Sequence, residues 1–569
     1  MKTKLAILAL CTVATAQAQN DNELQRDVEV VNTYMPTISN PQKMHRSPVM
    51  DDTMSYKPTF KYSILSKLSS IKTDPDSIRA ATMNFPRERT IYKSMVKGGA
   101  GNVAAMGRYF YNIGTSEDYH LSLGLGHQST FGKVKLDDDS KADAPLHETD
   151  AGIDFGYFFG NHAFAARMDF ENTAYRYYGL PGVLPLYAYA SESSEVSYDL
   201  GDDKQRHSNF GAAISLCNSK VDPHEKLSYR AAFGFDVFST KTGVRETDFS
   251  VDGRFLFPFN ETFIGGIDAS LHTAFTSVPD NDAIFVYERR KHTDVQVAPH
   301  LGLDFDNATV RFGLRLIAEM ESEKDDLFLQ PEVSGNMHIA EGIVTLFARI
   351  YGDYRANTYK QMMLENPYVM ADENVHSSND PFVVSAGLRA RFSNKVSFMA
   401  SATYGTYEDE HFWINKPVAF ADGTVAVVNR FTAELDDGKL FKAHGELNIT
   451  PGNRSSILLT ATYFNWDNNY ITAWHKPQYT AGLDARFFAT PKLLLSTNVN
   501  LTGERKVLIY SQSAKLDMIY DVNLEAEYFI NSRWTAFVRA NNVAACKYVS
   551  YYGYNVHSFN AMGGLTFKF

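Results

Sequence analysis

Cysteine is scarce in this chain, and long apolar runs are absent. With only three cysteines in 569 residues, the chain has no disulfide framework of the kind that stabilises small exported domains. No run of 18 apolar residues follows the N-terminal stretch, which excludes a helical membrane protein. The formal net charge of -11 at pH 7 argues against a nucleic-acid partner. What remains is an ordinary hydropathy combined with many aromatic residues, 32 Tyr and 39 Phe.

The first 18 residues carry the marks of export. Two lysines precede a short apolar stretch, Leu5–Val13, and a small-x-small cleavage motif follows at Ala16 and Ala18. This pattern predicts a secretory signal peptide over residues 1–18, too short to span a bilayer. Cys11 is an alternative lipidation site, but Leu10 stands before it where a small residue is needed, so we place Cys11 inside the discarded peptide.

An exported, aromatic-rich chain of this size is either a large secreted β protein or a transmembrane β-barrel, and strict alternation of apolar and polar residues favours the barrel. One face of a predicted strand carries Val310, Phe312, Leu314, Leu316, Ala318 and Met320, and the other carries Arg311, Arg315, Glu319 and Glu321. A second strand opposes Tyr520, Val522, Leu524, Ala526 and Tyr528 to Asp521, Asn523, Glu525 and Glu527. Such segments have the length of membrane strands, about 9–11 residues, and a wet barrel interior accepts several acids on one face.

Short turns rich in Gly, Asn, Asp and Pro recur at a regular spacing. They lie at 114–117, 160–161, 218–225, 258–261, 306–308, 340–342, 393–395, 451–454, 490–491 and 531–532. The intervening connections are mostly longer, as at 130–147, 174–204, 277–291, 355–379 and 408–437. Short turns on one side and long loops on the other indicate an outer-membrane β-barrel. Adding one strand at each end, we predict an all-β, antiparallel up-and-down barrel of about 22 strands over residues 92–569.

The chain ends on "HSFNAMGGLTFKF", in which every second residue is apolar. Phe559, Ala561, Gly563, Leu565, Phe567 and Phe569 share one face. We expect this stretch to be the closing strand, which pairs with the first strand and removes the sheet edge. Phe567 and Phe569 would then lie in the aromatic girdle at the periplasmic interface.

The final strand with its terminal Phe569 resembles the C-terminal signature of Gram-negative outer-membrane proteins. The longer stretch "RANNVAACKYVSYYGYNVHSFNAMGGLTFKF", Arg539 to Phe569, resembles the end of TonB-dependent receptors of the Bacteroidota. The resemblance covers about residues 91–569. It implies a 22-stranded barrel in the outer membrane, solute uptake, outer-membrane lipid as surroundings, and a TonB-type energy transducer or other envelope proteins as partners.

The N-terminal segment departs from that family. Residues 19–91 are about half of what a folded plug needs, and they contain Pro36, Pro41, Pro48, Pro58, Pro75 and Pro86. We expect extended chain here, in the periplasm or the lumen. Asp27, Val28, Val30 and Val31 are candidates for a TonB-box-like segment that contacts the transducer; the alternative is a strap without that contact.

Two groups of residues are candidate functional features. The predicted loop 175–190 is apolar, and its side chains either form an exposed contact surface or fold inward onto other loops. These side chains are Tyr175, Tyr177, Tyr178, Leu180, Leu184, Tyr187 and Tyr189. Inward charges such as Arg311 and Glu525 either guide a substrate or pair across strands.

The histidines show no ligand spacing in the sequence, and no Ser-His-Asp constellation is apparent. His127, His272 and His300 are scattered among predicted lumenal strands and loops. We therefore expect no enzyme activity, no metal site and no cofactor. Cys217 and Cys546 should be free thiols, because the strand directions put them at opposite membrane faces, about 30 Å apart.

Three functions stay open at this point. The first is TonB-dependent-receptor-like solute uptake across the outer membrane. The second is a plugless barrel that serves as a structural subunit of an assembly, secretion or lipoprotein complex. The third is a passive pore. A 22-stranded lumen is ordinarily plugged, so something must close it in the first two cases.

Overall fold

The computed structural model describes residues 93–569 of the chain, with internal gaps. The gaps are 116–117, 137–138, 180–182, 186–201, 219–221, 225, 279–289, 322–324, 341, 372, 374, 420–424, 453 and 510–511. The predicted signal peptide with Ala16 and Ala18, and the TonB-box-like residues Asp27, Val28, Val30 and Val31, lie outside the described residues.

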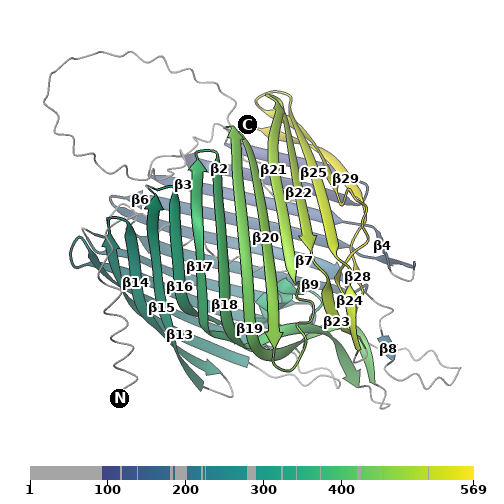
Figure 1. The fold of residues 1–569 in the computed structure, drawn as a ribbon. Helices are drawn as coiled ribbons and strands as arrows, with labels where there is room; N and C mark the ends of the chain where they lie inside the picture. The colour runs from purple at the N-terminus through teal and green to yellow at the C-terminus, as the bar shows by residue number, and fades with distance from the viewer. Residues whose placement is uncertain are drawn as a thin grey trace.

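The described chain folds into a closed antiparallel β-barrel (Figure 1). The main sheet holds 23 strands; the short β8 (Val183–Pro185) pairs only with β19, and the other 22 strands form the wall. The first wall strands are β1 (Ser94–Gly101), β2 (Ala104–Thr115), β3 (Tyr119–Thr130), β6 (Leu146–Phe159), β7 (His162–Arg176), β9 (Lys204–Cys217), β10 (Ser228–Thr240) and β11 (Arg245–Pro258). There follow β12 (Phe263–Ser277), β13 (Arg290–Phe305), β14 (Ala308–Glu321), β15 (Asp325–Ala340), β16 (Val344–Arg355), β17 (Ser378–Ser393) and β18 (Val396–Ala419). The last are β19 (Val425–Gly452), β20 (Ser455–Asn468), β21 (Tyr479–Thr490), β22 (Leu493–Thr502), β25 (Ile519–Phe529), β26 (Trp534–Asn541) and β29 (Asn560–Lys568).

The barrel closes between its first and last strands, as the C-terminal pattern predicted. β1 and β29 pair antiparallel with Met95 opposite Lys568, and the backbones of Ser94 and Phe569 exchange two hydrogen bonds of 2.9 Å. Phe567 lies 4.5 Å from Trp534 and 5.4 Å from Phe569 between ring centroids. This aromatic group sits at the short-turn end of the barrel, where an interfacial girdle belongs.

The two faces of the wall differ as the alternation predicted. On β14 the side chain of Leu314 is 54% exposed on the outer face, and on β25 that of Leu524 is 43% exposed, while Asp521 and Glu525 are buried on the inner face. Closure of the barrel lets the strands make their hydrogen bonds within the sheet, and an apolar outer surface is suited to contact with lipid. This architecture places the chain in a bacterial outer membrane.

All ten predicted short turns fall between consecutive wall strands, from β2–β3 to β25–β26. Gly342, in the β15–β16 turn, has φ of 75°, which favours glycine. Four connections at the opposite end are also short, β1–β2, β10–β11, β14–β15 and β18–β19. The predicted long connection 408–437 is therefore wrong, because β18 continues to Ala419 and β19 begins at Val425. Cys217 ends β9 beside a short turn, whereas Cys546 lies in the β26–β29 connection at the opposite end, and both thiols are free, as expected.

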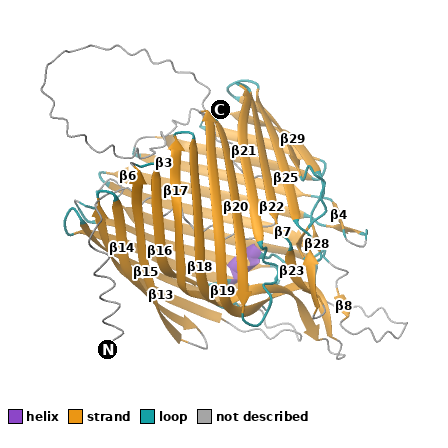
Figure 2. Cartoon of the chain, in the orientation of Figure 1, coloured by secondary structure: helices purple, strands orange, loops and turns teal. Residues whose placement is uncertain are grey.

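The longer connections carry small elements of their own. These are the hairpins β4 (Lys133–Lys135) with β5 (Lys141–Asp143), β23 (Arg505–Ile509) with β24 (Gln512–Leu516), and β27 (Val549–Tyr551) with β28 (Tyr554–Asn555). The helix α2 (Tyr359–Glu365) lies inside the outline of the barrel (Figure 2). Among the described residues, no helix is long and apolar enough to cross a membrane.

Candidate functional site

The connection between β16 and β17, residues 356–377, turns into the barrel; we name it the roof loop. Thr358 caps the start of its helix α2. The Thr358 hydroxyl accepts a hydrogen bond from Gln361 N at 3.2 Å, and the Gln361 side chain accepts one from Thr358 N at 3.1 Å. This reciprocal pair is a capping box, which makes a helix start at this position. The helix ends at Glu365, before the Asn366–Pro367 pair, because proline disfavours helical backbone in the residue that precedes it.

The start of α2 is fixed to the wall by Glu246 of β11. Its buried carboxylate accepts hydrogen bonds from the backbone N–H groups of Tyr359 at 2.8 Å and Lys360 at 3.1 Å. A carboxylate at this end of a helix also meets the positive end of the helix dipole. The Lys360 ammonium pairs with Asp236 of β10 at 2.7 Å. One end of the helix is therefore held by two neighbouring strands.

The other end of α2 is fixed to a separate part of the wall through Glu365. Its carboxylate contacts His411 Nε2 at 2.7 Å and accepts a hydrogen bond from Trp413 Nε1 at 3.0 Å, both on β18. The Lys476 ammonium lies 4.0 Å away, and the Tyr551 hydroxyl donates to the Glu365 carbonyl at 2.8 Å. The roof loop thus bridges β10–β11, β18 and the β20–β21 and β26–β29 connections.

These ionisable groups are matched in charge. Burial alone would raise the pKa of Glu365, but the charges of His411 and Lys476 hold it well below its usual range. Burial also lowers the pKa of Lys476, yet the nearby carboxylates of Glu410 and Glu365 outweigh this and raise it above its ordinary value. Breaking one member of such a buried pair leaves the other charge unpaired, which costs about 3–5 kcal/mol.

An apolar core joins the roof loop to four other outer connections and strand ends. Tyr368 stacks on Tyr554 with ring centroids 3.4 Å apart, and the Arg430 guanidinium lies 3.2 Å from the Tyr177 ring centroid. Met370 N donates to Phe431 O, and Phe431 N donates to Tyr368 O, each at 2.9 Å. The buried members are Tyr175, Tyr177, Phe238, Val244, Tyr359, Met362, Met363, Tyr368, Val369, Val375, Trp413, Phe431, Tyr551 and Tyr554. We name this cluster and the roof loop together the roof.

His475, in the β20–β21 connection, packs against the roof residues Phe431 and Tyr551. Its Nδ1 lies 2.7 Å from Trp413 O, and its ring is fully buried beside Arg505. Burial and the Arg505 charge lower the pKa of His475 to about 3, so its imidazole is neutral at physiological pH. A neutral ring is suited to this position, because no carboxylate among the described residues contacts it.

The structure places the residues of the predicted contact loop in different surroundings. Tyr175 and Tyr177 are buried in the roof, and the Tyr178 hydroxyl donates to Asn555 O at 2.7 Å, so these three take the inward-folding alternative rather than forming an exposed surface. The reason is the dense set of aromatic partners on the roof loop and the β26–β29 connection. The backbone of Leu184 pairs with Val427 as part of β8. Leu180, Tyr187 and Tyr189 lie outside the described residues.

The inward charges pair across strands, which is the second of the two predicted alternatives. Arg311 binds Asp268 at 2.7 Å, and Arg315 binds Glu332 at 3.1 Å. Near the seam, Lys97 lies 3.2 Å from Glu525 and 3.5 Å from Glu527. Arg539 also binds Glu525, at 2.9 Å. Arg315–Glu332 and Arg539–Glu525 join neighbouring strands, whereas Arg311–Asp268 and the Lys97 pairs reach across the strands that lie between their partners.

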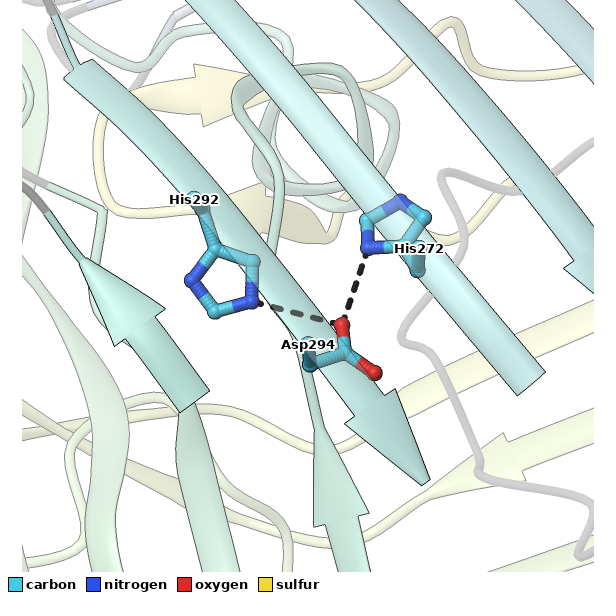
Figure 3. A group of neighbouring side chains, drawn as sticks. All are labelled: His272, His292 and Asp294. Carbon is cyan, nitrogen blue, oxygen red and sulfur yellow. Dashed lines mark hydrogen bonds and ion pairs between the residues drawn. The ribbon is translucent and has the colours of Figure 1, made fainter. Parts of the chain in front are cut away.

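The structure also brings together a group that the sequence reasoning missed. His272 on β12 and His292 and Asp294 on β13 converge on the inner face of the wall (Figure 3). His272 stands directly opposite Asp294 in the strand register, and His292 and Asp294 share a strand face. The sequence signal was the His-x-Asp spacing, combined with a histidine on the preceding strand. His127 and His300 lie outside this group, in contact with Thr149 and Arg311 respectively.

His272, which shows no ligand spacing in the sequence, thus belongs in the structure to a group that could hold a metal ion. Three potential ligand atoms, one from each residue, lie within 4.8 Å of one another. The scattered positions in the sequence hid this arrangement because antiparallel pairing brings together residues 20 or more positions apart. His272 and Asp294 are separated by 22 positions along the chain and by 3.1 Å between Nδ1 and Oδ1.

Comparison with known proteins shows the fold but no family. No protein-family model matches the sequence, and no curated protein matches it. Among solved structures, the chain is similar to the ferripyoverdine receptor of the outer membrane of Pseudomonas aeruginosa, with a TM-score of 0.60 and 11% identity over 84% of this chain and 72% of that one. The FrpB iron transporter from Neisseria meningitidis gives 0.61 and 12% over 84% and 81%. The ferric-catecholate import receptor Fiu from E. coli gives 0.58 and 9% over 84% and 82%.

These neighbours are described as receptors and transporters. At 9–12% identity the likeness concerns the barrel, and it carries no residue-level role to this chain.

Proposed function

We propose that the chain is an outer-membrane uptake receptor of the TonB-dependent type. In this proposal a solute enters from the outer face, the roof opens, and a TonB-type transducer supplies the energy. Residues 1–18 would direct export. Residues 19–91 would lie in the periplasm or lumen in place of a full plug, with Asp27, Val28, Val30 and Val31 as the contact with the transducer.

The roof is the observation that carries this proposal. A barrel of 22 strands encloses a lumen wide enough to need a plug, and here the outer connections fold inward over it. The roof loop is attached at two separate places, Glu246 and Glu365, by hydrogen bonds and ion pairs rather than by covalent links. Such attachments can be released and re-formed, which suits a gate that opens on ligand binding.

The structural resemblance supports the same class of function. The neighbours named above bind or import iron compounds, so a chelated metal ion is the first class of solute to test for this chain. The roof argues against a passive pore, because a pore that conducts at rest needs an open lumen.

A second candidate function is a structural subunit of an envelope complex. It is favoured by the size of the buried apolar core of the roof, since opening it would expose many aromatic side chains to water. A roof that never opens would suit a barrel whose task is to hold partners.

One experiment separates the two candidates. The full chain, carrying an affinity tag in an exposed outer connection, is cross-linked in cells, extracted in mild detergent and purified. Uptake predicts cross-links from the N-terminal segment to the TonB-type transducer, lost when residues 19–34 are deleted. A structural role predicts other envelope proteins in stoichiometric amounts, which that deletion leaves in place. Recovery of the barrel without the transducer would contradict the uptake proposal.

A further inference from the structure

We propose that His272, His292 and Asp294 form a binding site for a divalent transition-metal ion of the zinc class, on the inner face of the wall beside the roof loop. The site rests on three donor atoms that converge, on the partners that orient them, and on access from the lumen. It is independent of the proposed uptake function, because a wall site of this kind could serve a transporter or a scaffold.

The donor spacing fits one ion. Zinc binds imidazole nitrogen and carboxylate oxygen at about 2.0–2.2 Å, so two ligands of a tetrahedral ion lie about 3.4 Å apart. The distance from Asp294 Oδ1 to His272 Nδ1 is 3.1 Å, and that from Asp294 Oδ1 to His292 Nε2 is 3.4 Å. The remaining pair, between the two imidazoles, lies within 4.8 Å, so a small ring rotation completes the set (Figure 3).

His272 has the second partner that metal-bound histidines have, since its Nε2 lies 2.8 Å from Asp248 Oδ2. A carboxylate also stands behind His292, because its buried Nδ1 lies 3.5 Å from Glu319 Oε1 without a hydrogen bond among the described residues. A carboxylate behind a histidine fixes its ring and raises its basicity toward a metal. Asp294 is arranged in the same way, because its Oδ2 accepts a hydrogen bond from Gln296 at 3.0 Å and Oδ1 is left to face the two rings.

Charge and access agree with a cation. The carboxylates of Asp248, Asp294 and Glu319 surround two imidazoles, and a divalent ion offsets this excess of negative charge. The His272 side chain is 21% exposed, so the site is reachable from the lumen. The Tyr354 hydroxyl lies 3.2 Å from His292 Nε2, a contact that the ion would replace.

The site is joined to the base of the roof loop. The hydroxyls of Tyr354 and Ser377, which stand at the two ends of that loop, both donate to Glu319 Oε1. Glu319 in turn faces His292. An ion that fixes His292 would therefore restrict the two chain ends of the roof loop, at Tyr354 and Ser377.

Metal binding is measured on the purified full chain in detergent, carrying a tag without histidines, after removal of metal with a chelator. The probes are Zn²⁺ by calorimetry and Co²⁺ by its visible absorption. We expect one ion per chain, and a Co²⁺ spectrum with nitrogen and oxygen ligands. His292→Ala should weaken binding at least tenfold. Asp248→Asn, which alters only the partner of a ligand, should weaken it by about 10- to 100-fold.

His444→Ala is the matched control, since His444 lies on β19, outside the group, and contacts the Thr462 hydroxyl at 2.9 Å. This variant should bind as the wild type does. The proposal is overturned if the wild type binds less than one ion per chain at micromolar Zn²⁺. It is equally overturned if the folded His292→Ala variant, judged by its unheated gel mobility, binds as tightly as the control. Either result would mean that the imidazoles serve only as ion-pair partners of the carboxylates.

Discussion

Glu365→Ala should loosen the roof. The substitution removes the carboxylate that contacts His411 at 2.7 Å, Trp413 at 3.0 Å and Lys476 at 4.0 Å, and it leaves those groups buried without that partner. The Glu365 side chain is only 20% exposed, so water cannot fully replace it. The cost of breaking a buried pair, about 3–5 kcal/mol, corresponds to about 150- to 5,000-fold more frequent opening.

Hydrogen exchange read by mass spectrometry measures this opening directly. The reporter is a backbone amide whose bond joins the roof loop to β19, Met370 N, which donates to Phe431 O at 2.9 Å. Peptides covering 359–370 should exchange about 150- to 5,000-fold faster in the variant, while peptides from the wall strands stay protected.

A matched control removes a glutamate of the same kind from a neighbouring connection. Glu504 pairs with Lys515 at 2.9 Å but is 59% exposed, so Glu504→Ala should change stability by less than about 1 kcal/mol. The reasoning is refuted if the roof-loop amides exchange equally in the two variants. That outcome would show that the carboxylate of Glu365 does not hold the roof.

Three further outcomes follow from the structure. Acidification should open the roof, because the fold favours neutral His475, whose pKa is lowered from 6.5 to about 3, and ionised Glu365. The stabilisation is full above about pH 6.5 and is lost as the pH falls toward 3. Tryptophan fluorescence would follow the opening, and a roof insensitive to pH over this range would contradict the prediction. Lys97→Met should weaken the seam, because it removes the cation that lies between the buried carboxylates of Glu525 and Glu527; the folded band on unheated gels should disappear at a lower temperature than in the wild type, and an unchanged temperature would contradict this. On intact cells a membrane-impermeant maleimide should label Cys546 and spare Cys217 until the outer membrane is permeabilised, whereas the reverse order would invert the barrel.

The wall of the barrel could be predicted from the sequence because lipid imposes a local rule. Each strand must alternate, so Leu314 and Arg315 reveal their faces without knowledge of any partner, and each short turn carries its own Gly, Asn, Asp or Pro signal. The closing strand was equally visible, since Phe567 and Phe569 repeat the same alternation up to the last residue.

The roof could not be predicted in the same way. Its contacts join residues far apart in the chain, such as Glu246 with Tyr359 and Tyr177 with Arg430, and no periodic pattern encodes them. The sequence showed only that the loop from Tyr175 onward is apolar, which fits an exposed contact surface and an inward fold equally well. The capping box at Thr358 and Gln361 was the one local signal for α2, and it identifies a helix start without placing that helix in the lumen.

The His272 group is a second feature that could not be predicted from the sequence. The register that sets His272 opposite Asp294 depends on how β12 and β13 pair, which no local pattern in the sequence fixes. Spacing along the chain therefore carries little information about ligands on different strands, whereas the pair His292 and Asp294 on one strand could have been noticed.

The most direct test of the account is whether the roof loop is packed as a lid over the lumen. Met363 and Leu364 are neighbours on α2 with 3% and 54% exposure, so single cysteines at these positions, in a chain lacking Cys217 and Cys546, should react with a maleimide at very different rates. A packed roof predicts rapid labelling at Leu364→Cys and at least tenfold slower labelling at Met363→Cys. Equal, rapid labelling at both positions would mean that the loop does not close the barrel.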